Sequence, residues 1–154
     1  MSLDGSSGGA PIPGLPDKYK QGTLYLQVGT NLLVSCHPDY VMIHRLVPLA
    51  PDRTFVECFW LFPQQAFDLP GFDPSYAVDF WDITNRQDWT ACESVQRGLA
   101  WRGARPAPLR AYHEGGLRPV TQWVAPAYAA GANPATPVAA TAPETAISRR
   151  RVNL

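Results

Sequence analysis

The chain has 154 residues, with 13 Lys and Arg against 13 Asp and Glu, so its formal net charge at pH 7 is zero. Binding to nucleic acid or to an anionic membrane begins with clustered basic charge, and no apolar run approaches the roughly 20 residues that cross a bilayer. We therefore expect no nucleic-acid or membrane partner, and the length fits one compact domain.

The cysteines are odd in number and form no C-x-x-C pair; they are Cys36, Cys58 and Cys92. This pattern argues against a disulfide framework and against a zinc knuckle. The first residues have neither a basic start nor an apolar core of about 7–15 residues, so we expect no secretory signal. The sequence thus predicts reduced thiols and a cytoplasmic location.

Composition divides the chain into three parts. Residues 1–22 are rich in Gly, Ser and Pro and are expected to form an extended N-terminal segment. Residues 129–154 are rich in Ala, Pro and Thr, include Arg149–Arg151, and are expected to form a disordered tail. Residues 23–128 remain as the folded part.

Four runs in the first half of the folded part have the composition or the alternation of strands. They are Thr23–Val28, Asn31–His37, Tyr40–Val47 and Arg53–Phe62. Pro38-Asp39 suits a tight turn between the second and third runs, and a hairpin closed there would pair His44 near Leu33. The prediction is a meander of about four antiparallel strands.

The period then becomes helical. Asp73 is a good N-cap and Pro74 fits the first helical position, so a helix over Pro74–Arg97 would span about 36 Å. Seven residues recur at spacings of three and four and form one face, namely Val78, Trp81, Asn85, Asp88, Cys92, Val95 and Leu99. Sheet and helix together predict an α+β fold.

Two polar residues, Asn85 and Asp88, lie in the middle of this apolar face. An ionised carboxylate that leaves water for a packed interface costs several kcal/mol unless it is paired or bound to a cation. Taken alone, the helix leaves two interpretations of Asp88 open: a salt bridge with a basic side chain such as Arg86 or Arg97, or a metal-binding or catalytic role.

Three runs then follow one another in a defined order: NLLVSCHPDYVMIHRLVPLAPDRTFVECFWLFP, FDPSYAVDFWDIT and NRQDWTACESVQRGL (Asn85–Leu99). In this order they resemble the C-terminal part of the catalytic domain of Rieske-type non-haem iron ring-hydroxylating oxygenase α subunits, most closely the choline-monooxygenase-like, demethylating subgroup. The resemblance extends over roughly Ser2 to Tyr128. It implies a partial helix-grip, START-like catalytic domain.

The resemblance also implies a chemistry. In that family a mononuclear Fe(II) is held by two His and one carboxylate, which leaves open positions for O₂ beside the substrate. Asp88 matches the carboxylate ligand, and Asn85 and Gln87 are candidate donors that would orient it. The implied reaction is O₂-dependent hydroxylation, of aromatic rings in many members, or demethylation of a small organic substrate. Electrons would come from a reductase through a [2Fe-2S] Rieske cluster.

This chain lacks several parts of that machinery. A Rieske cluster needs a Cys-x-His and a Cys-x-x-His pair, neither of which occurs, and the two His ligands precede the matched region in the family. None of His37, His44 and His113 is assigned to iron. We therefore expect a truncated domain with negligible activity alone, completed by an upstream polypeptide or a homo-oligomer. The alternatives are an inactive fragment and a non-catalytic helix-grip module that binds an apolar ligand.

The last predicted element departs from the family pattern. Leu117–Tyr128 contains Pro119 and Pro126, each of which removes an amide hydrogen and disfavours helical geometry in the residue before it. The sequence predicts a broken or frayed terminal helix. By itself the partial domain is expected to leave one edge of its sheet and the pocket side uncovered, which is a liability for aggregation.

Overall fold

The computed structural model describes residues 1–105, 108–110, 112, 114–129 and 148–153. The chain divides into two units, one of Met1–Ala100 with Ala146–Leu154 and one of Trp101–Thr145. The first unit contains the sheet and its long helix, and the described residues of the second include a further helix.

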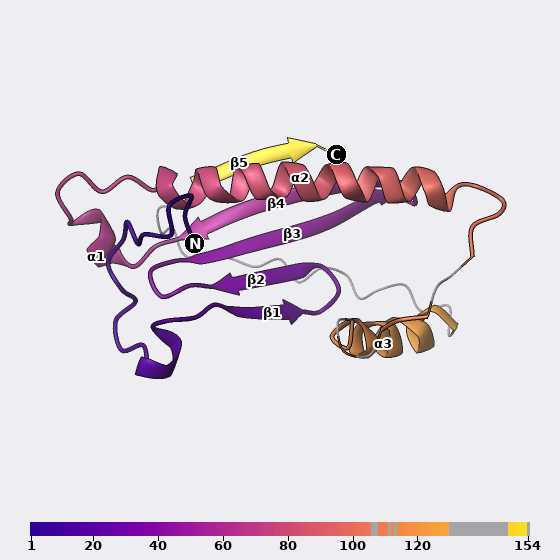
Figure 1. The fold of residues 1–154 in the computed structure, drawn as a ribbon, viewed down its shortest axis with the longest axis horizontal. Helices are drawn as coiled ribbons and strands as arrows, with labels where there is room; N and C mark the ends of the chain where they lie inside the picture. Colours follow the sequence, from indigo (N-terminus) through magenta and orange to yellow (C-terminus); the bar gives the residue numbers. More distant parts are fainter. Residues whose placement is uncertain (106–107, 111, 113, 130–147, 154) are drawn as a thin grey trace. The chain divides into compact units, whose positions relative to one another are not determined.

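An antiparallel sheet of five strands, in the order β1-β2-β3-β4-β5, forms the first unit (Figure 1). The first four strands follow one another in the chain as a meander, as predicted. Their bounds agree closely with the predicted runs. The five strands are β1 (Leu24–Val28), β2 (Leu32–Cys36), β3 (Val41–Ala50), β4 (Arg53–Leu61) and β5 (Ser148–Asn153).

The turn between β2 and β3 sets the register of the meander. The backbone N–H of His37 donates to the carbonyl oxygen of Tyr40 at 2.9 Å, on either side of Pro38-Asp39. Leu33 then lies opposite His44, and His44 lies opposite Cys58 on β4. The predicted hairpin and its register are confirmed.

Strand β5 differs from the disordered tail predicted for residues 129–154. Ser148–Asn153 runs antiparallel to β4, with Ser148 opposite Trp60 and Asn153 opposite Phe55. The physical reason is that the outer edge of β4 presents main-chain donors and acceptors that a further strand can satisfy. Residues 130–147 lie outside the described residues.

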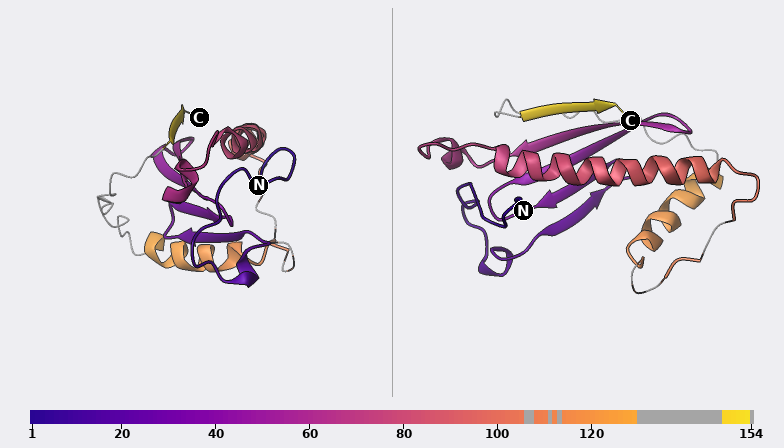
Figure 2. Two further views of the ribbon diagram at one scale, coloured as in Figure 1. Left: turned by 90° about the vertical axis from the view of Figure 1, so that its left-hand side faces the viewer. Right: turned by 45° about the horizontal axis from the view of Figure 1, so that its top comes forward.

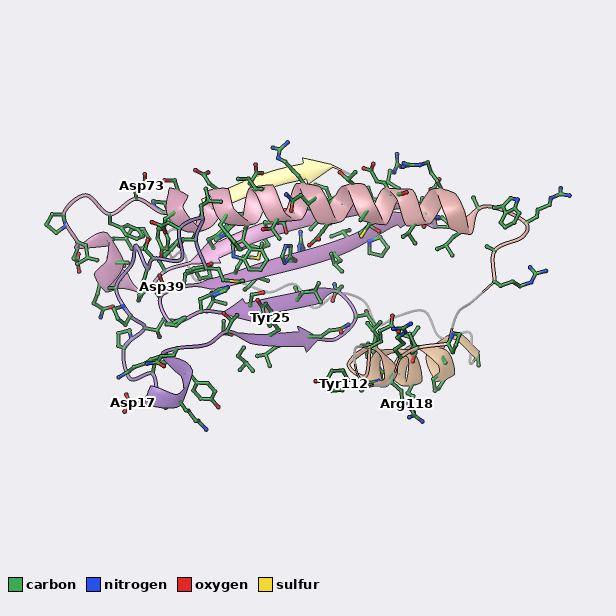
Figure 3. The ribbon with its side chains drawn as sticks, in the orientation of Figure 1. Asp17, Tyr25, Asp39, Asp73, Tyr112 and Arg118 are labelled. Carbon is green, nitrogen blue, oxygen red and sulfur yellow. The ribbon has the colours of Figure 1, made fainter. Side chains whose placement is uncertain are left out.

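Three helical segments accompany the sheet in the first unit: η1 (Asp17–Tyr19), α1 (Gln64–Phe67) and α2 (Ser75–Leu99). Helix α2 begins one residue after the predicted start at Pro74 and ends two residues after the predicted end at Arg97. The Asp73 carboxylate accepts a hydrogen bond from the Ser75 N–H at 2.9 Å (Figure 3). Two views show α2 running along the sheet (Figure 2). In the part of the chain that is described, no helix is both long enough and apolar enough to span a membrane.

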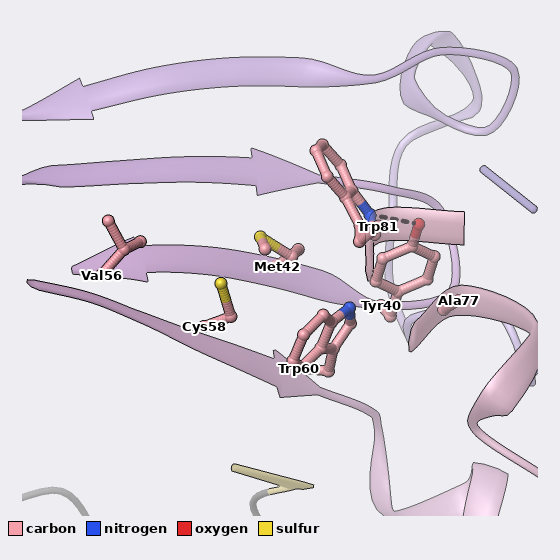
Figure 4. Packing of buried hydrophobic residues seen from close by; sticks show 7 residues of the cluster. All are labelled: Tyr40, Met42, Val56, Cys58, Trp60, Ala77 and Trp81. Atoms are coloured by element: carbon pink, nitrogen blue, oxygen red, sulfur yellow. Dashed lines mark hydrogen bonds between the residues drawn. The ribbon is translucent and has the colours of Figure 1, made fainter. Parts of the chain in front are cut away.

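The core lies between one face of the sheet and the first half of α2. It is built from seven buried residues: Tyr40, Met42, Val56, Cys58, Trp60, Ala77 and Trp81 (Figure 4). The indole N–H of Trp81 donates to the hydroxyl oxygen of Tyr40 at 3.0 Å, which joins helix and sheet. Since Met42 and Cys58 belong to this core, the side chains of β3 and β4 in step with them face α2.

The second unit contains helix α3 (Leu117–Ala129). The prediction of a broken or frayed helix over Leu117–Tyr128 is wrong. Pro119 lies in the first turn, where an amide hydrogen has no partner within the helix, so its absence costs little. Pro126 lies inside the last turn, where a missing bond affects only the end of the helix.

Candidate functional site

Helix α2 changes environment between Asn85 and Asp88. Asn85 is 4% exposed, whereas Asp88 and every residue from Thr90 to Leu99 are exposed. The predicted burial of Asp88 is therefore wrong. The buried core faces only the first half of the helix, so the predicted apolar face continues into solvent through Cys92, Val95 and Leu99.

The salt-bridge interpretation of Asp88 also loses its basis. The guanidinium of Arg86 pairs with Asp82, one turn earlier, with its Nε atom 2.9 Å from Asp82 Oδ2. Asp88 takes part in none of the ion pairs found among the described residues. Because Asp88 is exposed, its carboxylate needs no partner for stability, and it can accept a ligand from solvent.

Directly beside Asp88, Asn85 joins the helix to two strands. Its Oδ1 atom lies 3.0 Å from the Nε2 atom of His44 on β3, and its Nδ2 amide donates to the Sγ atom of Cys58 on β4 at 3.7 Å. The imidazole of His44 also meets the ring of Trp81 edge-on, with centroids 5.7 Å apart. These contacts hold the middle of α2 in one rotational position over the sheet.

The electrostatics of this cluster keep it neutral. Burial lowers the pKa of His44, while its hydrogen bond to the amide oxygen of Asn85 and the negative charge of Asp88 oppose that shift. Burial, assisted by the charge of Asp82, raises the pKa of the Cys58 thiol to about 11. At neutral pH the cluster therefore consists of an uncharged imidazole, an amide and a thiol, with the carboxylate of Asp88 close enough to influence His44.

The other predicted site residues behave differently. Gln87 is exposed, and the contacts recorded for the described residues do not join it to Asp88. Sequence reasoning missed the contact between His44 and Asn85. The hairpin register indicated where His44 lies in the sheet, but nothing in the sequence relates that strand to the rotation of α2.

His37, like His44, meets the ring of Trp81 edge-on, with centroids 5.9 Å apart. It is 2% exposed, its ring stacks on Tyr40 at 4.3 Å, and its Nδ1 atom lies 3.1 Å from the hydroxyl of Thr23. Burial first, and then the positive N-terminal amine, lower its pKa to about 4, against the opposing effect of Asp39. His113 lies outside the described residues.

The described residues do not complete a mononuclear iron site. A facial triad needs three donors, and no group of three or more His, Cys, Asp and Glu among the described residues could hold a metal ion. Asp88 offers one exposed carboxylate. The nearby imidazole of His44 already has its Nε2 atom committed to Asn85.

A cavity of about 370 Å³ lies elsewhere, between the N-terminal segment and the start of α2. Eight residues line it: Ser2, Leu3, Asp4, Ser6, Asp73, Ser75, Tyr76 and Asp79. Asp88 is not part of this lining.

The antiparallel sheet and the long helix define an α+β domain. Residues 1–130 match the family model "Ring hydroxylating alpha subunit (catalytic domain)". The chain therefore belongs to this family.

Two relatives are similar to this chain over most of its length. It is 27% identical over 123 residues to the glycine betaine monooxygenase oxygenase subunit of Chromohalobacter salexigens, and 27% identical over 126 residues to that of Pseudomonas aeruginosa. The aligned regions cover 80% of this chain but only 28% and 29% of the relatives. No solved structure matches the chain.

Proposed function

We propose that this chain is the C-terminal part of a Rieske-type oxygenase catalytic domain, with a partial helix-grip fold, and that Asp88 is the carboxylate ligand of its mononuclear Fe(II). The iron, when bound, supplies the site at which O₂ is activated. The contribution of this chain is to hold one oxygen ligand at a defined place on a rigid helix.

The observation that carries this proposal is the position of Asp88 one turn after Asn85. Asn85 is anchored to β3 and β4 through His44 and Cys58, so the turn that follows cannot rotate freely. Asp88 is at the same time exposed, which leaves its oxygens available to a metal. We propose Asn85 as the residue that orients Asp88; Gln87, which is exposed, is the weaker candidate.

The remaining ligands and the electron donor would come from a second polypeptide. The chain spans less than a third of the length of its relatives, and its described residues supply one ligand of three. We propose that an upstream polypeptide carrying two imidazole ligands and the Rieske cluster completes the site, with a reductase as electron source. The isolated chain then has negligible activity.

The relatives also indicate a class of substrate. Both are named as glycine betaine monooxygenases, so we propose a small organic substrate of the methylated-amine type, which the reaction would hydroxylate or demethylate. The competing function is a module that binds an apolar ligand without iron. The match to a catalytic-domain family favours the iron-dependent function over it.

Anaerobic Fe(II) titration tests this proposal. The full chain and Asp88→Ala would each be titrated alone and with the remaining segment of the Pseudomonas aeruginosa oxygenase subunit, supplied as a separate polypeptide. The expected result is tight iron binding only when both polypeptides are present and Asp88 is intact. Glu93→Ala is the matched control, because Glu93 is an exposed carboxylate on the same helix.

Iron that binds equally well to Asp88→Ala and to the unchanged chain, in the presence of the second polypeptide, would overturn the assignment of Asp88. Turnover by this chain with a reductase but no other polypeptide would overturn the shared site. A complex that binds no iron at all would favour the inactive fragment.

A further inference from the structure

His44 lies on the middle strand of the sheet, where its backbone has little freedom. Strand β3 is third of five in the strand order, and at His44 it pairs with Leu33 of β2 on one side and with Cys58 of β4 on the other. His44 follows Met42 of the core by two residues, so its side chain belongs to the side of the sheet that carries α2. Main-chain pairing on both sides therefore fixes the base of this side chain.

The hydrogen bond between His44 and Asn85 has a defined direction. The amide oxygen Oδ1 of Asn85 lies 3.0 Å from the Nε2 atom of His44, and the Nδ2 group of the same amide donates to the Sγ atom of Cys58. Because an amide oxygen only accepts hydrogen bonds, the Nε2 atom of His44 must carry the proton and act as the donor. The neutral imidazole is then protonated on Nε2 and not on Nδ1.

Aromatic packing holds this donor in place. The ring of His44 meets the ring of Trp81 edge-on, with centroids 5.7 Å apart and an angle of 75° between the planes. Trp81 is 8% exposed, and its indole N–H donates to the hydroxyl of Tyr40. The imidazole is thus restrained by a paired backbone and by a buried indole, so its Nε2–H group points in one direction.

We infer that His44 is a positioning residue for Asp88, which rests on the proposed function of Asp88 as a metal ligand. His44 acts through Asn85. Three residues correspond to about 300° of helix rotation, so the side of α2 on which Asp88 emerges is set by the direction in which Asn85 points. Trp89 also packs against the core, but apolar packing is non-directional. The hydrogen bond supplies the direction, because it forms only over a narrow range of distances and angles.

This role differs from that of a residue that only fills space. If His44 acted by packing, another ring of similar size would replace it. If it acts as a donor, a donor without the ring would replace it. His44→Phe keeps a ring beside Trp81 and removes the donor, whereas His44→Gln removes the ring and supplies an amide donor. The two substitutions therefore separate the two roles.

Anaerobic Fe(II) titration tests the role of His44, with the full chain and the separate segment of the Pseudomonas aeruginosa oxygenase subunit together. We expect His44→Phe to weaken iron binding about tenfold or more, because groups that orient a metal ligand typically contribute about 10–100-fold to metal affinity. His44→Gln should bind iron to within about threefold of the unchanged chain, since the donor to Asn85 is restored.

His37→Phe is the matched control. His37 is also buried and also meets the ring of Trp81 edge-on, but the contacts found among the described residues do not join it to Asn85. This substitution should leave iron affinity unchanged. A metal-free measurement on the chain alone accompanies the titration: the nitrogen NMR shifts of the His44 ring should show the proton on Nε2.

The outcomes separate this role from the proposed function. A His44 ring protonated on Nδ1, iron binding by His44→Phe equal to that of the unchanged chain, or an equal loss in His37→Phe would overturn the role of His44 and leave Asp88 as a ligand. Equal losses in His44→Phe and His44→Gln would also overturn it, because His44 would then act by packing. Iron binding that is absent or independent of Asp88 would overturn the proposed function, and the role of His44 with it.

Discussion

The Nε2 atom of His44 and the Oδ1 atom of Asn85 lie 3.0 Å apart, so strand β3 and helix α2 meet through a polar contact in an otherwise apolar interface. The Nδ2 group of the same Asn85 amide donates a hydrogen bond to the Sγ atom of Cys58. Buried polar groups that are satisfied in this way specify one relative position of the elements that carry them. The contact therefore defines where the next turn of α2, with Asp88, emerges.

Removal of the Asn85 amide should destabilise the fold. We expect Asn85→Leu to lower the free energy of unfolding by about 1–3 kcal/mol, because His44 loses a hydrogen-bond partner in a largely dry interface. Urea denaturation measures the effect. Gln87→Leu, an exposed position two residues away, should change the free energy by less than about 0.5 kcal/mol. Equal effects of the two substitutions would contradict the role given to Asn85.

We expect Asp88 to be dispensable for folding, whereas its charge should affect the pKa of His44. Because Asp88 is exposed, we expect Asp88→Asn to change the free energy of unfolding by less than about 0.5 kcal/mol. Its negative charge raises the pKa of His44, so the same substitution should lower that pKa further. NMR titration of the His44 ring protons measures the shift, and Glu93→Gln serves as the control. A His44 pKa that rises in Asp88→Asn would refute this relationship.

Stability should depend on pH through His37. Its pKa is about 4 in the folded chain against an ordinary value of 6.5, so the unfolded chain binds the proton first as the pH falls. The contribution of the His37 imidazole to the free energy of unfolding is fully present above pH 6.5. It falls by about 3 kcal/mol as the pH approaches 4. Denaturation at several pH values should show a shallower decline for His37→Phe than for the unchanged chain. Parallel curves for the two proteins would be inconsistent with a buried neutral His37.

The N-terminal segment should be sensitive to substitution at Gly8. A Cβ atom at this position would lie 2.5 Å from the ring of Tyr76, and that ring is held by a 2.8 Å hydrogen bond from its hydroxyl to Asp39. We expect Gly8→Ala to cost about 1–3 kcal/mol. Gly22→Ala is the control, since nothing lies within 4 Å of its Cβ position. Thermal denaturation of both variants measures the two effects. If Gly8→Ala is as stable as Gly22→Ala, the predicted crowding at Gly8 is wrong.

The rate of thiol labelling should distinguish the exposed Cys92 from the buried Cys58. Cys92 is exposed and Cys58 is buried, with a pKa raised to about 11. At pH 8 an aromatic disulfide reagent should modify Cys92 rapidly and Cys58 only as fast as the chain opens. Mass spectrometry of the labelled peptides identifies the sites. Rapid labelling of Cys58 in the native chain would contradict its place in the core.

Much of the fold was predictable because it depends on local patterns. Alternation along the chain predicted the four strands of the meander, Pro38-Asp39 predicted the register that pairs Leu33 with His44, and Asp73 predicted the start of α2. The periodicity of α2 likewise identified Asn85 as a residue of the buried face. These features follow from backbone geometry and side-chain period, which a sequence contains.

Other features were decided only by the tertiary structure, because they depend on what covers each surface. The helical period places Asp88 on the same face as Asn85, but the core ends before Asp88, so this carboxylate is exposed. The contact between His44 and Asn85 depends on the rotation of α2 over the sheet. The pairing of Ser148–Asn153 with β4 joins segments far apart in the chain, and no local period encodes such a contact.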